Sequence, residues 1–117
     1  MITIVWEYQV KTNHISEFQK IYASNGKWTE LFKKGKGYIG TRLIRSPDHP
    51  NLFITIDQWQ SVTDYNTFIS QWKMEYKKLD QQCQGLTEHE SCLGTFGADF
   101  NDEENTGDFW SIIDNLR

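Results

Sequence analysis

The chain has 117 residues, a length typical of one domain, and 15% of them are aromatic. Its net charge of −4 is uneven, because residues 98–117 hold six acids and one base while residues 1–97 hold ten acids and eleven bases. A nearly neutral body argues against nucleic-acid binding, which needs a clustered basic surface. No run of about 18 apolar residues is present, so we expect no membrane-spanning helix and no membrane partner.

The two cysteines, Cys83 and Cys92, do not have the spacing of a metal or redox motif. We expect both to be free thiols that are buried or half-buried, as is usual in a reducing compartment. The first residues do not form a charged leader followed by a long apolar run, so no signal peptide is predicted. These features together predict a cytoplasmic protein.

The first half of the chain predicts two strands with two short helices between them. Residues 2–10 alternate as in a strand, and one face carries Ile2, Ile4, Trp6, Tyr8 and Val10. Residues 15–23 have helical spacing, and a second helical piece follows the break at Asn25-Gly26. Residues 38–46 predict the second strand.

The second half predicts a hairpin, a long helix and a last short strand. Two prolines at residues 47–51 favour a turn, and residues 52–59 predict the strand that completes the hairpin. Residues 61–83 predict one continuous helix, because apolar side chains recur with a period of about 3.6 residues. Residues 92–96 predict the fourth strand.

The last 20 residues differ from the rest in composition. Residues 97–107 are acidic and rich in turn-forming residues, which is typical of a linker. A short amphipathic helix is predicted after it, with Phe109, Trp110, Ile112, Ile113 and Leu116 as its apolar residues. We therefore predict a domain over residues 1–97 and a linker with a C-terminal helix over residues 98–117. We expect this helix to dock on the partner of a dimer, with docking on its own domain and a disordered tail as the alternatives.

The order of these elements is that of a split β-α-β unit. It predicts an α+β, ferredoxin-like fold with a four-stranded antiparallel sheet and helices on one face. The residues expected on the opposite face are Val5, Ile39, Leu43, Phe53 and Thr55. Because this face is apolar, we expect a second copy to cover it, giving a homodimer of the dimeric α/β-barrel type.

Four short motifs carry a resemblance to a known family. They are Tyr8-Gln9-Val10-Lys11, Trp28-x-x-Leu31-Phe32, Gly37-Tyr38-Ile39-Gly40-Thr41, and Thr55-Ile56-Asp57-Gln58-Trp59-x5-Tyr65-x-x-Phe68. Over roughly residues 1–97 the chain resembles the antibiotic biosynthesis monooxygenase (ABM) domain superfamily. That superfamily includes cofactor-independent monooxygenases, haem-degrading enzymes and members without an assigned activity.

The resemblance implies a pocket between the sheet and the helices in which Trp and Tyr side chains hold a phenolic molecule. Trp59 and Tyr65 match the positions of such a pair. Further candidates for substrate binding, from the same predicted faces, are Trp6, Tyr8, Trp28 and Trp72. The alternative for each ring is core packing, since a Trp at this strand–helix join also docks the helix on the sheet.

Two residues are candidates for catalysis, Tyr65 and His89. His89 lies between Glu88 and Glu90, where it could act as a general base or orient a phenol. The alternative is a histidine in a surface turn. The three histidines of the chain lack the spacing of metal ligands, so we expect no metal and no cofactor.

Asp57 interrupts the apolar residues of the third strand, and a carboxylate there needs a partner or solvent. We expect an ion pair with Arg42 or Arg45 on the neighbouring strand, and we weigh a catalytic base as the alternative. The haem-degrading branch is a poorer match. Its helical histidine is missing from residues 75–80, and Trp6-Glu7-Tyr8 stands where its asparagine is expected.

Two classes of function remain open. The first is a cofactor-independent monooxygenase that acts on a small aromatic or polyketide-type molecule, and the second is a non-catalytic ligand-binding or regulatory protein of the same fold. Oxygen uptake with dihydroxy-aromatic compounds would distinguish them. Haem degradation is the third and weakest alternative.

Overall fold

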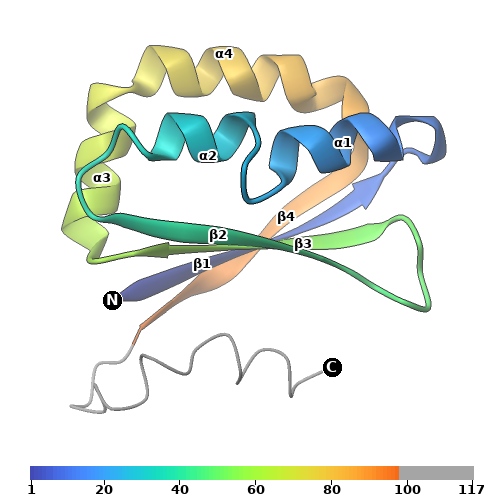
Figure 1. The fold of residues 1–117 in the computed structure, drawn as a ribbon, viewed down its shortest axis with the longest axis horizontal. Helices are drawn as coiled ribbons and strands as arrows, with labels where there is room; N and C mark the ends of the chain where they lie inside the picture. The colour runs from blue at the N-terminus through green and yellow to red at the C-terminus, as the bar shows by residue number, and fades with distance from the viewer. Residues whose placement is uncertain (98–117) are drawn as a thin grey trace.

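The computed structural model describes residues 1–97; the predicted acidic linker and C-terminal helix lie outside the described residues. The main elements in chain order are β1 (Ile2–Val10), α1 (Ile15–Tyr22), α2 (Lys27–Phe32), β2 (Tyr38–Arg45), β3 (Leu52–Trp59), α3 (Val62–Gln71), α4 (Lys73–Cys83) and β4 (Thr87–Gly97) (Figure 1). Short 3-10 turns at Thr12–His14 and Gln84–Leu86 precede α1 and β4.

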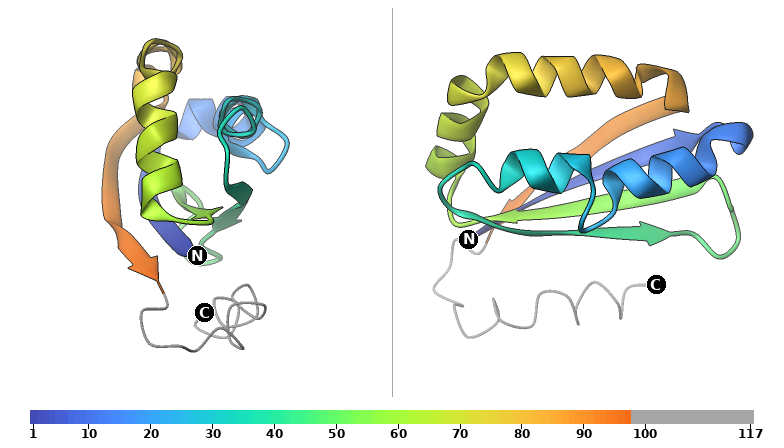
Figure 2. Two further views of the ribbon diagram at one scale, coloured as in Figure 1. Left: turned by 90° about the vertical axis from the view of Figure 1, so that its left-hand side faces the viewer. Right: turned by 45° about the horizontal axis from the view of Figure 1, so that its top comes forward.

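The four strands form one antiparallel sheet in the order β2-β3-β1-β4. The helices of residues 1–97 all lie on the same face of this sheet (Figure 2). Strand β1 is central because its residues alternate between the two faces and find partners on both sides, in β3 and β4. The predicted ferredoxin-like α+β fold is therefore confirmed, with an open rather than a closed sheet.

The strand register decides which side chains face the helices. Tyr8 pairs with Phe53, Trp6 with Thr55, and Thr55 in turn with Leu43, so all of these side chains share the helix-covered face. The prediction that Leu43, Phe53 and Thr55 lie on the opposite face is wrong. Side chains of a strand alternate between its two faces, so Phe53 and Thr55 lie on the same face as Trp59, which is buried against the helices.

The core is built mainly of aromatic rings. Phe18 and Tyr22 stack with their ring centroids 4.1 Å apart, and Phe53 packs on Phe18 at 5.1 Å. Trp59 and Phe68, 5.1 Å apart, join the helix α3 to the sheet. Such pairs add to the stability that area burial provides, by about 0.5–1.5 kcal/mol each.

The predicted long helix is broken at Trp72. This residue has φ −113° and ψ 26°, outside the helical region, and α3 and α4 run in different directions on either side of it (Figure 1). Lys34 Nζ lies 4.8 Å from the centroid of the Trp72 ring. The break lets α3 dock on the strand end at Trp59 while α4 crosses above the sheet. The apolar residues of 61–83 therefore pack on the sheet from two helices with different directions.

Strand β4 is longer than predicted. It has 11 residues and begins at Thr87, whereas the sequence predicted only residues 92–96. The strand lies at the edge of the sheet and most of its residues are exposed. An exposed edge strand needs no apolar alternation, so its backbone pairing with β1 was not visible in the sequence.

Within residues 1–97, no helix has the length and apolar character needed to cross a membrane.

Candidate functional site

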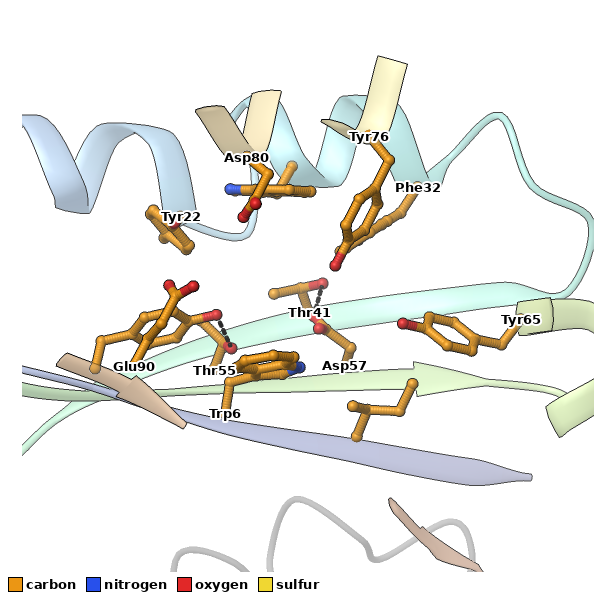
Figure 3. Close-up of a pocket in the computed structure, with 13 residues that line it drawn as sticks. Trp6, Tyr22, Phe32, Thr41, Thr55, Asp57, Tyr65, Tyr76, Asp80 and Glu90 are labelled. Carbon is orange, nitrogen blue, oxygen red and sulfur yellow. Dashed lines mark hydrogen bonds between the residues drawn. The ribbon is translucent and has the colours of Figure 1, made fainter. Parts of the chain in front are cut away.

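A pocket lies between the helix-covered face of the sheet and the helices α2, α3 and α4 (Figure 3). Its volume is about 560 Å³, including the open mouth. Side chains from all four strands and from α1 to α4 line it: Ile4, Trp6, Tyr8, Tyr22, Trp28, Phe32, Thr41, Thr55, Asp57, Tyr65, Tyr76, Asp80 and Glu90. The ring-rich wall with a few polar groups is typical of a small-molecule site.

Four of the six side chains predicted to bind substrate line this pocket: Trp6, Tyr8, Trp28 and Tyr65. Trp6 and Tyr8 come from alternate positions of β1, and Tyr65 comes from the first turns of α3. Figure 3 shows Tyr65 and Trp6 on opposite sides of Asp57, with the Tyr65 hydroxyl directed inward. The aromatic wall was therefore readable from the sequence.

Trp59 and Trp72 do not line the pocket. Trp59 is 0% exposed and packs between Tyr38, Phe68 and Tyr65, so its ring belongs to the core. Trp72 is half-buried at the junction of α3 and α4, under Lys34. For these two tryptophans the core-packing alternative describes the structure.

His89, a predicted catalytic residue, lies outside the pocket. It is exposed on β4 and pairs with the exposed Gln9, whereas its neighbour Glu90 pairs with Tyr8 and lines the pocket. Successive residues of a strand point to opposite faces, which separates these two side chains. The acid beside the histidine, rather than the histidine, reaches the site.

Asp57 is the charged residue deepest in the pocket, at 8% exposed. Thr41 Oγ1 donates a hydrogen bond of 2.6 Å to Asp57 Oδ1. Burial raises the pKa of Asp57 from its ordinary 3.8 to about 6, although the Thr41 hydrogen bond acts in the opposite direction. At neutral pH this carboxylate is ionised and more basic than an exposed one.

The predicted ion pair of Asp57 with an arginine is wrong. Arg42 pairs with Ile56 in the ladder and therefore lies on the opposite face from Asp57. Arg45 donates a hydrogen bond of 2.6 Å from Nε to the carbonyl oxygen of Pro50, and its guanidinium lies over the Phe53 ring. The register of β2 against β3, which the sequence did not reveal, places Thr41 beside Asp57 instead.

Several tyrosines give the pocket neutral hydroxyl groups. Burial raises the pKa of Tyr8, of Tyr65 and of Tyr76 above the ordinary value of 10.0, so all three are protonated at neutral pH. Thr55 Oγ1 donates to the Tyr8 hydroxyl at 3.3 Å. These hydroxyls can donate hydrogen bonds to a bound molecule.

All charged residues that line the pocket are acidic: Asp57, Asp80 and Glu90. Glu90 is exposed as a residue, but partial desolvation of its carboxyl group and the nearby Asp80 raise its pKa. The lining of the pocket therefore includes an exposed acid, Glu90, as well as the buried carboxylate of Asp57. No three His, Cys, Asp or Glu side chains within residues 1–97 are arranged to hold a metal ion.

The profile of the antibiotic biosynthesis monooxygenase family matches residues 1–72, which include the first three strands and Asp57. The chain belongs to this family. No curated protein sequence matches it. The match covers the strand–helix join and the pocket residues of β1, β2 and β3, whereas α4 and β4 follow it.

Solved structures of other proteins share the fold of this ABM-family chain. SnoaB, a cofactor-independent oxygenase from Streptomyces nogalater, has a TM-score of 0.70 at 19% identity, over 87% of this chain and 96% of SnoaB. A conserved protein from Methanosarcina mazei Go1 has a TM-score of 0.62 at 14% identity, over 81% of this chain and 89% of its own. PA3566 from Pseudomonas aeruginosa has a TM-score of 0.61 at 11% identity, over 83% of this chain and 92% of its own. At these identities the likeness concerns the fold.

Proposed function

We propose that this protein is a cofactor-independent monooxygenase that acts on a small phenolic molecule, with Asp57 as the general base. The observation that carries the proposal is a buried carboxylate, with a pKa raised to about 6, inside a pocket walled by aromatic rings. Family membership and the shared fold with SnoaB, a cofactor-independent oxygenase, support the reaction class. The proposed ligand is an aromatic or polyketide-type molecule.

The pocket favours a neutral or cationic aromatic molecule over an anionic one. The half-buried ring of Trp6 can stack on a planar substrate, and the buried ring of Trp28 adds an apolar wall. The acidic residues Asp80 and Glu90 would repel a substrate carboxylate and attract an amino group or a phenolic hydroxyl. A phenol with hydroxyl or amino substituents fits both properties.

The proposed chemistry begins with proton transfer to Asp57. An activated methylene carbon beside the phenol ring loses a proton, and Asp57 becomes a neutral acid. The carbanion passes one electron to O₂, and the two radicals combine into a peroxide on that carbon. Asp57 returns its proton to the peroxide. Loss of water, with the second methylene hydrogen leaving as a proton and the O–O bond breaking, forms a carbonyl group.

The oxidation balances without a further reductant, because one oxygen atom enters the product and the other leaves as water. Asp57 suits the first step, since a base with a pKa nearer to neutrality accepts a proton more readily while it remains ionised at pH 7. The Tyr65 and Tyr76 hydroxyls can stabilise negative charge on the phenolic oxygen by hydrogen bonding.

We propose a homodimer in which the face of the sheet opposite the helices contacts a second copy. This face carries apolar residues at Val5 and Ile54, both half-buried, and Phe96, on the partner position of Thr3, is 55% exposed. Large exposed rings beside an apolar surface favour association. Light scattering at micromolar concentration measures the mass, and a monomer there contradicts the dimer.

Oxygen uptake tests the enzymatic proposal. We expect uptake with at least one dihydroxy-aromatic compound that carries an activated methylene group on its ring, when no flavin or metal is added, with one O₂ consumed per substrate and no hydrogen peroxide released. Asp57→Asn is expected to lower the rate by about 100-fold or more, which is typical of losing a general base. The Thr63→Ala variant, on the exposed side of α3, serves as a control with unchanged rate.

The same panel can contradict the proposal. If none of the compounds causes oxygen uptake while one binds with micromolar affinity, the protein is a ligand-binding or regulatory member of the fold. If uptake persists in Asp57→Asn at the original rate, another group takes the proton.

A further inference from the structure

Three side chains of β2 and β3 form a hydrogen-bonded chain that ends at the pocket. The Tyr38 hydroxyl is 2.6 Å from Thr41 Oγ1, and Thr41 Oγ1 is 2.6 Å from Asp57 Oδ1. Thr41 and Asp57 are direct partners in the strand ladder, so the backbone holds them side by side. Tyr38 is half-buried against Phe32 and Trp59 and lies outside the pocket lining.

The direction of the chain follows from counting protons. A threonine hydroxyl has one hydrogen, and Thr41 uses it on the carboxylate of Asp57. The contact between Tyr38 and Thr41 must therefore have Tyr38 as its donor. Both hydroxyl dipoles point toward the negative charge, and each hydrogen bond polarises the next.

We infer that Tyr38 is a positioning residue that acts on Asp57 through Thr41, and that the chain leaves Oδ2 as the oxygen that meets a bound molecule. The hydrogen bond from Thr41 occupies Oδ1. With Thr41 held by Tyr38, the carboxylate keeps one orientation, which leaves its second oxygen to meet a molecule bound in the pocket that Asp57 lines. The role of this arrangement in turnover rests on the proposed function, whereas the hydrogen bonds from Tyr38 through Thr41 to Asp57 do not depend on it.

Other titratable groups also face Asp57. Tyr8 comes from β1, Tyr65 from α3, Tyr76 and Asp80 from α4, and Glu90 from β4. The tyrosines are neutral at working pH because burial raises the pKa of Tyr8, Tyr65 and Tyr76, whereas Asp80 and Glu90 are acids that line the same pocket. The hydroxyl chain from β2 is therefore a separate influence on Asp57, and it can be removed without changing the charges of the site.

The test is a pH titration of Asp57 by carbon NMR of the side-chain carboxyl in the full chain, without any ligand. Thr41→Val is expected to raise the pKa of Asp57 by about one unit, since it removes a hydrogen bond to the charged form. Tyr38→Phe should raise it by about half as much, and Thr41→Ser, which keeps the hydroxyl, should restore the original titration. Thr55→Val is the matched control, because Thr55 donates to Tyr8 and should leave the pKa of Asp57 unchanged.

Tyr38→Phe alone decides the matter if Thr41→Val does not fold, because it keeps the ring that packs on Phe32 and Trp59. If the pKa of Asp57 in Tyr38→Phe equals that in the wild type, the inference is overturned.

In an active enzyme, the acidic limb of the rate against pH should shift by the same amount as the pKa measured by NMR. If the pKa of Asp57 shifts in the variants but no compound is oxidised, the positioning of Asp57 by Tyr38 and Thr41 is supported and the proposed function fails. If the pKa of Asp57 shifts while the acidic limb of the pH–rate profile of an active enzyme does not, the role of Tyr38 in turnover is overturned.

Discussion

Trp59 and Tyr65 pack edge to face with their ring centroids 5.5 Å apart, yet they serve different parts of the molecule. Trp59 is completely buried among Phe32, Tyr38 and Phe68, and Tyr65 lines the pocket. The buried Trp59 ring thus holds the Tyr65 ring in place at the pocket. Because Trp59 contributes to the core and Tyr65 to the pocket, substitution of Trp59 should change mainly stability and substitution of Tyr65 mainly ligand binding or turnover.

Tyr65→Phe should leave the fold intact and change ligand binding or turnover. The ring keeps its contact with Trp59, and only the pocket-facing hydroxyl is lost. A missing hydrogen bond costs about 0.5–1.5 kcal/mol, which corresponds to a loss of roughly 2- to 10-fold in affinity or in kcat/KM. Thermal melting and ligand titration measure the two effects. Unchanged binding and turnover would place Tyr65 in the core alone.

Trp59→Ala should destabilise the domain by about 3–5 kcal/mol, as expected for removing a large buried ring. Trp59→Phe should cost less than half of this, because it keeps an aromatic ring and removes the Nε1–H group, which is buried and has no hydrogen-bond partner in the described part of the chain. Denaturant unfolding measures both. Equal losses for the two variants would contradict this account of the core.

Asp57→Asn should stabilise the protein at pH 7.5. The pKa of Asp57 is about 6 in the folded chain, against an ordinary value of 3.8, so the folded state binds more protons between these pH values. The free energy of unfolding should therefore fall as pH rises from about 4 to about 6 and stay constant above, a loss on the order of 3 kcal/mol for a shift of about two units. The amide cannot ionise and avoids this cost.

Melting temperatures of the wild type and Asp57→Asn, measured from pH 4 to pH 8, check this prediction. The wild type should show the decline and the variant should show less of it. A variant that is less stable than the wild type at pH 7.5 contradicts the raised pKa. Combined with the loss of oxygen uptake, a stabilised Asp57→Asn would indicate a residue kept for function at a cost in stability.

His89→Ala and Glu90→Gln should differ although the residues are adjacent. Glu90 lines the pocket, whereas His89 is exposed on the opposite face of β4. We expect Glu90→Gln to weaken the binding of an aromatic amine more than that of a neutral phenol, and His89→Ala to change neither. Binding titrations with the two probes compare them. A loss of turnover in His89→Ala would restore the histidine as a catalytic candidate.

The sequence by itself determined the order of the elements and the ring-rich wall of the pocket. The alternation in residues 2–10 and the prolines of residues 47–51 are local signals, because side-chain period and proline geometry act within a few residues. Trp6 and Tyr8 could be assigned to the helix-covered face for the same reason. The strand–helix join at Trp59 identified the fold, since a large ring there has to be buried.

Only the tertiary structure decided the face of β3, the extent of β4 and the break at Trp72. Both faces of β3 carry apolar residues, so the alternation of residues 52–59 does not reveal which one meets the helices, and the register with β1 places Asp57 in the pocket. Its partner Thr41 is 16 residues away and comes to it through the β2–β3 ladder. The raised pKa of Asp57 follows from burial, which depends on contacts between distant segments and leaves no local pattern in the sequence.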